Sequence, residues 1–163
     1  ETLLVLFNVN TLKGRSFLNG RPLADSLNMI QIKRANNFFI NDSYWLLGHL
    51  RLEEPGVKVL LQEPEDIDGI HCQVLYVTAE NVSQNPGGQY WFYVNPDNGQ
   101  IKRWKVLAEG QKEAAVYDWT KLKDLGGGLK LSTRKQNINQ NNAVTFPVAS
   151  VLISVEPEKF TKK

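Results

Sequence analysis

The chain has 163 residues, of which 42% are hydrophobic and 22% are charged, and its formal net charge is +2. This is one domain's worth of sequence, able to bury about 70% of the surface that the unfolded chain exposes. The near balance of 19 Lys and Arg against 17 Asp and Glu excludes nucleic acid as the main partner. One cysteine excludes an internal disulfide and a multi-cysteine zinc site. No stretch approaches the roughly 20 apolar residues of a membrane span, so we expect no transmembrane segment.

The first elements are a hairpin and a helix. Residues Leu3–Asn10 are rich in strand formers, and Arg15–Leu18 reads as the returning strand, closed by Asn19-Gly20. The period then changes to that of a helix over Leu23–Ile40, with Pro22 suited to its first turn. One face of this helix carries Leu23, Leu27, Ile30, Arg34 and Phe38.

The rest of the chain reads as a succession of strands. Pro96-Asp97-Asn98-Gly99 is strong turn chemistry, because Pro presets φ and Gly supplies a positive φ. Glu63–Gly69 reads as an acidic turn, and Pro147 predicts an edge strand or a bulge in the last element. The predicted strands are Val57–Gln62, Ile70–Ala79, Gln89–Asn95, Gln100–Leu107, Ala114–Trp119, Leu129–Lys135 and Ala143–Val155.

These elements predict an α+β fold in which a curved antiparallel sheet of about eight or nine strands is covered by one main helix. No composition shift marks an internal boundary, so we expect a single domain over residues 1–163. The chain begins at Glu1 without an initiator Met, and we expect a processed protein or a trimmed one.

Catalytic and metal-binding patterns are weak. The two histidines are His49 and His71, and Cys72 follows His71 directly, so a strand would point these two neighbours to opposite faces. Asp66-x-Asp68 resembles the start of a calcium loop but lacks the later ligands. We therefore expect no metal site, no cofactor and no catalytic residues, although a carboxylate pair far apart in the chain stays open.

The four Trp, five Tyr and seven Phe residues are the unusual feature of the composition. In the strand Tyr90-Trp91-Phe92-Tyr93, large rings alternate between both faces, and Trp104 is the expected cross-strand neighbour of one face. The rings form either a packed core or the lining of an apolar cavity fit for an acyl chain. Sugar stacking on exposed rings is a third reading. Arg34 either covers the core with its stem or serves as a polar anchor in such a cavity.

Three sets of residues resemble uncharacterised bacterial envelope proteins whose fold is related to the lipoprotein localisation factors (LolA/LolB-like). The first set is Phe39–Leu47 with Glu54-Pro55-Gly56-Val57. The second is Asn81-Val82, Pro86-Gly87, Tyr90-Trp91, Tyr93–Asp97, Gly99, Ile101 and Arg103-Trp104. The third is Trp119, Gly126-Gly127 and Leu131-Ser132-Thr133. The resemblance covers residues 36–135, and it departs at Gly48-His49 and at Gly88.

The resemblance implies a half-open β-barrel with helical cover, further N-terminal elements upstream of residue 1, and a periplasmic or envelope location. We expect a non-enzymatic protein that binds a hydrophobic or lipid-like ligand, such as a lipoprotein acyl chain, in the concave face of the sheet. The alternatives are a structural or protein-interaction domain with a packed aromatic core, and, third, a hydrolase. The candidate lining residues are Phe38, Tyr44, Trp45, Trp91, Tyr93, Trp104 and Trp119, with Arg34 as the candidate polar anchor.

Overall fold

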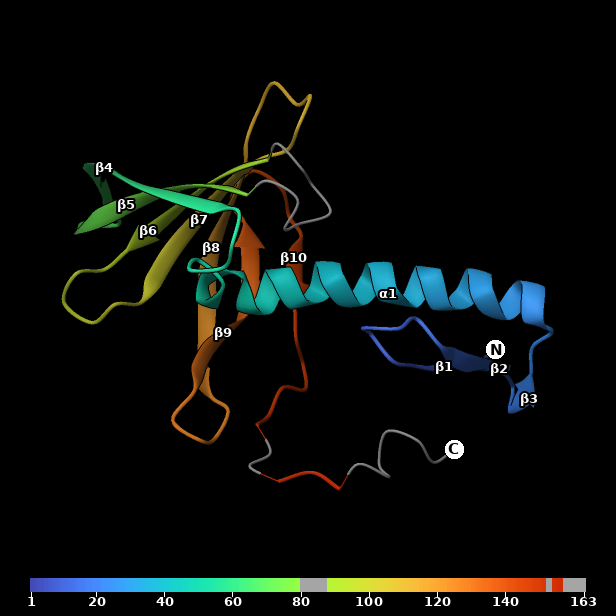
Figure 1. Cartoon of the computed structure of the whole chain (residues 1–163). Helices are drawn as coiled ribbons and strands as arrows, with labels where there is room; N and C mark the ends of the chain where they lie inside the picture. Colours follow the sequence, from blue (N-terminus) through green and yellow to red (C-terminus); the bar gives the residue numbers. More distant parts are fainter. Residues whose placement is uncertain (80–87, 152–153, 157–163) are drawn as a thin grey trace. The chain divides into compact units, whose positions relative to one another are not determined.

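The computed structural model describes residues 1–79, 88–151 and 154–156. The contacts group the chain into two compact units, unit 1 with residues 1–42 and 152–163 and unit 2 with residues 43–151. The fold is α+β, as predicted, and the described residues form one α-helix and ten strands in two separate antiparallel sheets (Figure 1). The helix α1, Asp25–Leu47, belongs to unit 1 as far as Asp42 and to unit 2 from Ser43. That residues 1–163 make a single domain stays a prediction.

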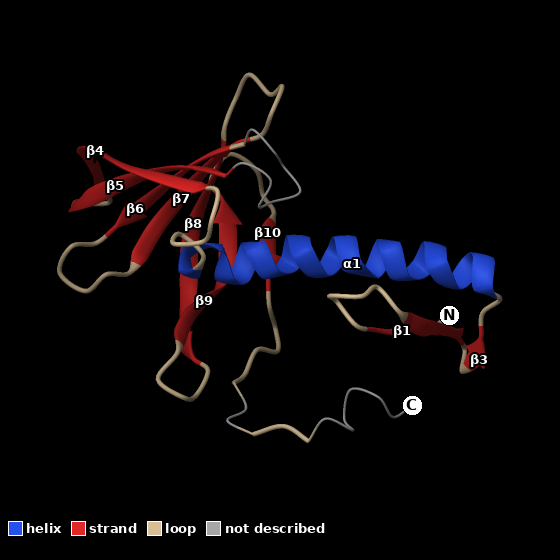
Figure 2. Ribbon diagram, viewed as in Figure 1, coloured by secondary structure: helices blue, strands red, loops and turns tan. Residues whose placement is uncertain are grey.

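Unit 1 contains a three-stranded sheet with the order β1-β2-β3. Its strands β1 and β3 are labelled in Figure 2, where strands are red. The predicted first hairpin is confirmed, since β1 pairs with β2 from Leu3 opposite Leu18 to Phe7 opposite Gly14. Asn19 and Gly20 both have positive φ, 48° and 82°, which suits the tight turn that follows β2. The strands are β1 (Leu3–Phe7), β2 (Gly14–Leu18) and β3 (Arg21–Pro22). Pro22 therefore ends a strand, and the prediction that it lies in the first turn of the helix is wrong, since α1 begins at Asp25.

A small polar network fastens β2 to the first turn of α1. The hydroxyl of Ser16, which is 1% exposed, donates to Oδ1 of Asn28 at 2.7 Å. Nδ2 of Asn28 in turn donates to the carbonyl oxygen of Gly14 at 3.1 Å. Both the oxygen and the nitrogen of the Asn28 amide thus form hydrogen bonds. Losing this side chain would leave the buried Ser16 hydroxyl without this partner.

The predicted apolar face of α1 is not the buried one. Leu27, Ile30 and Phe38 are 49%, 58% and 55% exposed, whereas Ile32 is 1% exposed. The helix also runs past its predicted end at Ile40 to Leu47, because the polar residues that suggested a stop there are followed by Tyr44 and Trp45, which pack on the sheet of unit 2. Tertiary packing overrides the weaker local preference.

Unit 2 contains a seven-stranded antiparallel sheet with the order β10-β9-β8-β7-β6-β5-β4. Each strand pairs with its neighbours in the sequence, and the sheet does not close into a barrel, so the curved, half-open form stays compatible. The 3-10 turn η1, Gly48–Leu50, follows α1. The strands are β4 (Val57–Ile67), β5 (Ile70–Ala79), β6 (Gln89–Val94), β7 (Ile101–Leu107), β8 (Ala115–Asp124), β9 (Lys130–Asn137) and β10 (Ala143–Thr145).

Three predicted boundaries in unit 2 are wrong, and one is the end of the strand predicted at Ala114–Trp119, since β8 continues to Asp124. The acidic segment predicted as a turn is mostly strand, since β4 continues to Ile67 with an irregular register between Gln62 and Glu65, and only Asp68-Gly69 turn the chain. The last predicted strand, Ala143–Val155, ends in fact at Thr145, shortly before Pro147, which cannot donate to a ladder. Its residues 152–153 lie outside the described part.

We predict that Asn28→Ala destabilises unit 1. Losing both hydrogen bonds should cost about 1 to 3 kcal/mol and speed amide exchange in β2 and the first turns of α1. Asn37→Ala is the matched control, because it makes the same change at an exposed position of the same helix. Hydrogen exchange followed by mass spectrometry checks this, and equal protection in the two variants would contradict it.

Candidate functional site

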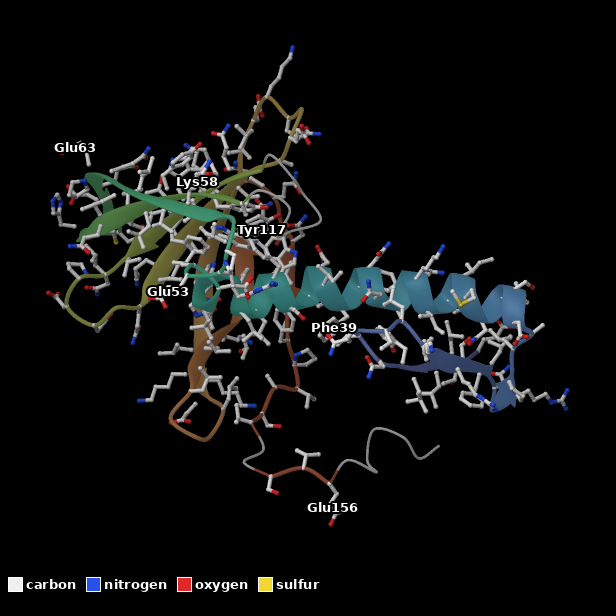
Figure 3. All side chains as sticks on the ribbon, viewed as in Figure 1. Phe39, Glu53, Lys58, Glu63, Tyr117 and Glu156 are labelled. Atoms are coloured by element: carbon white, nitrogen blue, oxygen red, sulfur yellow. The ribbon has the colours of Figure 1, made fainter. Side chains whose placement is uncertain are left out.

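The end of α1 packs against aromatic side chains of the sheet in unit 2. The ring of Trp45 meets that of Trp104 edge-on, with centroids 4.8 Å apart, and meets that of Tyr117 at the same distance. Tyr117 belongs to β8 and is labelled in Figure 3. Tyr44, one residue earlier, lies 5.2 Å from Tyr90 and 5.7 Å from Trp104. Edge-to-face and tilted pairs at these distances are favourable beyond the area that they bury.

Trp104 is the centre of this aromatic cluster. It lies directly opposite Phe92 in the β6–β7 ladder, and the two rings stack with centroids 5.7 Å apart and an interplanar angle of 7°. Phe92 is 1% exposed, and Trp104 and Tyr90 are each 2% exposed. The predicted cross-strand role of Trp104 is confirmed. Here and below, the aromatic cluster means Tyr44, Trp45, Tyr90, Phe92, Trp104, Tyr117 and Trp119.

The structure divides the predicted lining residues into three groups. Tyr44, Trp45, Trp104 and Trp119 come together in the aromatic cluster. Trp91 and Tyr93 lie on the opposite face of the sheet, where Trp91 Nε1 donates to Oε1 of Gln62 at 3.2 Å and Tyr93 joins a cluster with Ile67, Cys72 and Val74. Phe38 and Arg34 lie on the part of α1 that belongs to unit 1.

Arg34, the predicted polar anchor, is exposed, and its guanidinium lies 5.5 Å from the centroid of the Phe38 ring. Such a contact at an exposed site contributes about 0.5 to 1 kcal/mol. The contact between Arg34 and Phe38 is therefore enough to account for the positions of both side chains on the helix surface, without a bound ligand.

A buried lysine and a half-buried histidine adjoin Trp119. Nζ of Lys135 lies 3.9 Å from the centroid of the Trp119 ring and donates a hydrogen bond to the carbonyl oxygen of Ser132. His49, in η1, meets Trp119 edge-on with centroids 4.9 Å apart. Lys135 is 0% exposed and forms no ion pair with any residue that the structure describes.

This environment lowers the pKa of both Lys135 and His49, which favours their neutral forms. Burial lowers the pKa of Lys135 to about 8. Burial, and secondarily the charge of Lys135, lowers the pKa of His49 to about 4. His49 is therefore a neutral imidazole at pH 7, while Lys135 keeps most of its charge inside the fold.

A cavity of about 260 Å³ lies beside Trp119 within unit 2, and we call it the Trp119 cavity. It lies among η1, the β6–β7 turn and strands β7, β8 and β9. Its apolar lining comes from Ile101, Trp119, Leu122 and Leu131, and its polar lining includes His49, Lys102, Lys130 and Ser132. Trp119 is the predicted candidate that lines this cavity.

The backbone of β8 explains how Trp119 and Leu122 come to line the same space. Residues three apart in a regular strand point to opposite faces. Lys121, between them, has a φ of 53°, in the left-handed region that non-glycine residues seldom adopt. This residue interrupts the alternation within β8, so the strand contributes two apolar side chains to one cavity.

Two polar atoms of the cavity lining are buried without a hydrogen-bond partner among the described residues. They are Nδ1 of His49 and Nε1 of Trp119. Trp104 Nε1 shares this state within the aromatic cluster. A buried donor left unpaired costs about 1 to 3 kcal/mol, which makes such atoms a sign of either strain or an absent acceptor.

The remaining chemistry proposed from the sequence lies elsewhere. Nδ1 of His71 lies 2.9 Å from Oδ1 of Asp66 across the β4–β5 ladder, with side chains 72% and 77% exposed. Exposed pairs of this kind contribute little and offer no enclosed site. Within the described residues, no three His, Cys, Asp or Glu side chains are grouped closely enough to hold a metal ion.

Comparison with known proteins supplies no relative: no family model, no curated protein and no solved structure matches the chain. Among the described residues, no helix combines the length and the apolar character needed to cross a bilayer.

Sequence reasoning missed His49 and Lys135 as neighbours of Trp119. A signal for Lys135 was present, because Leu131, Thr133 and Lys135 alternate along β9 and are 2%, 7% and 0% exposed. His49 had no comparable signal, since its position depends on how α1 ends and on the turn that follows it.

We predict that His49 makes the protein less stable in acid. The unfolded chain binds a proton near pH 6.5 that folded His49 does not bind until about pH 4, so the free energy of unfolding falls as the pH drops through this window. The loss is on the order of 2 kcal/mol. In His49→Gln the loss of unfolding free energy that His49 causes should disappear. In His71→Gln, a variant of an exposed histidine, the same loss should remain. An NMR titration of the His49 ring with a midpoint near pH 6.5 would contradict the prediction.

We predict that Lys135 makes the free energy of unfolding depend on pH on the alkaline side. Between pH 8 and pH 9.5 the unfolded chain keeps the lysine proton while the folded chain releases it, so the free energy of unfolding rises with pH. Over this window the rise is on the order of 2 kcal/mol. Urea unfolding at each pH should show the rise in the wild type and in Lys112→Met, an exposed control, but not in Lys135→Met. A rise that persists in Lys135→Met would show that another group causes it.

Proposed function

We propose that the protein is a non-catalytic binding protein for a hydrophobic, lipid-like ligand, and that the apolar part of this ligand occupies the Trp119 cavity. The observation that carries the proposal is the cavity itself, about 260 Å³ with four apolar side chains and a few polar groups in its lining. Binding sites for small molecules have this composition. A location in the bacterial envelope belongs to the same proposal and is supported by the sequence resemblance.

The packing of the aromatic cluster determines where such a ligand fits. Tyr90, Phe92 and Trp104 are already in contact with one another and with the end of α1, so their surface is filled by the protein. The Trp119 cavity lies at the margin of this packed region. The ligand site is therefore at the edge of the aromatic cluster, where Trp119 lies, and not among Tyr90, Phe92 and Trp104.

The size of the cavity limits the ligand. A volume of about 260 Å³ lies below the ~300 to 1,000 Å³ that is typical of pockets for drug-sized molecules. The cavity therefore suits a short alkyl chain or one end of a longer one. Burying four methylenes would contribute about 3 kcal/mol before the costs of association are counted, so we expect weak, reversible binding.

A structural or protein-interaction role is the second candidate, and a specific observation favours it. The edge strand β4 presents Leu60 and Leu61 at 61% and 69% exposure. Edge strands with exposed apolar residues are templates for pairing with another chain. Under this alternative the aromatic cluster serves only as a core, and the Trp119 cavity binds no alkyl chain.

We predict that 1-octanol binds unit 2 and that Leu122→Trp blocks it. Leu122 is 49% exposed at the mouth of the cavity, so a larger ring there should fill the cavity with little cost to the fold. Saturable shifts of the Leu131 methyl signals in NMR spectra should follow octanol binding in the wild type. They should weaken at least tenfold in Leu122→Trp.

Leu60→Trp is the matched control, because it places the same ring at an exposed leucine of the same sheet. It should bind octanol as the wild type does. Binding that survives in Leu122→Trp, or no saturable binding in the wild type, would contradict the proposed function.

A further inference from the structure

The charges around the Trp119 cavity have one sign. Lys102 and Lys130 are its charged lining residues, and no Asp or Glu is among the described residues that line it. Asp124 lies opposite Lys130 in the β8–β9 ladder, but its carboxylate accepts a hydrogen bond from the backbone nitrogen of Gly126 at 2.9 Å. This carboxylate keeps its negative charge, but Asp124 is not among the residues that line the cavity.

The interior side of the cavity adds unused hydrogen-bonding capacity. Nδ1 of His49 and Nε1 of Trp119 are both buried and without a partner among the described residues. The indole nitrogen can only donate, and a neutral imidazole carries one N–H and one acceptor nitrogen. The indole N–H of Trp119 is itself fully buried, so an acceptor on a ligand pairs with it once the neighbouring side chains shift.

A third positive group lies behind the lining. Lys135 is fully buried against the ring of Trp119 and donates to the carbonyl oxygen of Ser132, and both of these residues line the cavity. A buried cation without an ion-pair partner among the described residues raises the electrostatic potential of its surroundings. Because Lys135 is 0% exposed, water screens its charge less than it screens the charge of an exposed lysine, and the potential beside Trp119 favours an anion.

We propose that the Trp119 cavity recognises the anionic head group of an amphipathic ligand, with Lys102 and Lys130 supplying charge and the indole of Trp119 supplying a hydrogen bond. This inference rests on the proposed function, because the alkyl body of the same ligand fills the apolar part of the cavity. The head group is a carboxylate or a phosphate ester, both of which offer several acceptor oxygens and a negative charge.

The test compares four eight-carbon probes that differ only in the head group: octanoate, octyl phosphate, 1-octanol and octylamine. Binding is measured by calorimetry on the full chain and by the shift of the Trp119 indole N–H signal in NMR spectra. We expect an anion to bind at least tenfold more tightly than octanol, and octylamine to bind more weakly than octanol. Whichever anion binds more tightly identifies the head group as carboxylate or phosphate.

The lysines are tested by the double variant Lys102→Gln/Lys130→Gln. It should reduce the affinity for the anion to within about threefold of the affinity that the same variant has for octanol. Lys112→Gln, an exposed lysine away from the cavity lining, should leave both affinities unchanged. If octanol and the anions bind equally well, the head-group inference is wrong and the proposed function stands. If none of the four probes binds, the proposed function fails with it.

Discussion

The contact between the end of α1 and the indole of Trp104 is the interaction on which unit 2 depends. Trp104 is held against Phe92 by the β6–β7 ladder, and Trp45 then stands edge-on to it at 4.8 Å. Large aromatic side chains dominate core energetics because each buries about 150 to 250 Å². The continuation of the helix to Leu47, the position of η1 and hence the position of His49 all follow from this packing.

The side chains around Trp119 pack less tightly than those around Trp104, and a cavity lies beside Trp119. There β8 passes through the left-handed residue Lys121, and a lysine occupies an inward position of β9 where an apolar residue would pack. A buried lysine costs stability at neutral pH, and a protein optimised only for its core would place a methionine or leucine there. Departures from the rules of stable packing are often found at functional sites, and here they adjoin a cavity.

Features that depend on residues close together in the chain, such as the turn at Pro96–Gly99, could be predicted from the sequence. The Pro96–Gly99 turn joins β6 to β7, and together with a register shift between Tyr93 and Val94 it places Phe92 opposite Trp104. The end of α1 was predicted too early, because Asn41 and its polar neighbours favour a helix stop locally and only the three-dimensional contacts of Tyr44 and Trp45 override them. Trp91 and Tyr93 were assigned to the cavity because alternation shows that two faces exist but not which one meets the helix. A lysine at an inward strand position was overlooked because charged residues are seldom buried.

Binding in the Trp119 cavity is tested most directly by NMR nuclear Overhauser contacts between a bound eight-carbon amphiphile and the protons of the protein. We predict contacts from the alkyl chain to the ring of Trp119 and to the Leu122 methyls, which line one cavity. Contacts to Trp91 and Tyr76, on the other face of the sheet, in place of these would contradict it.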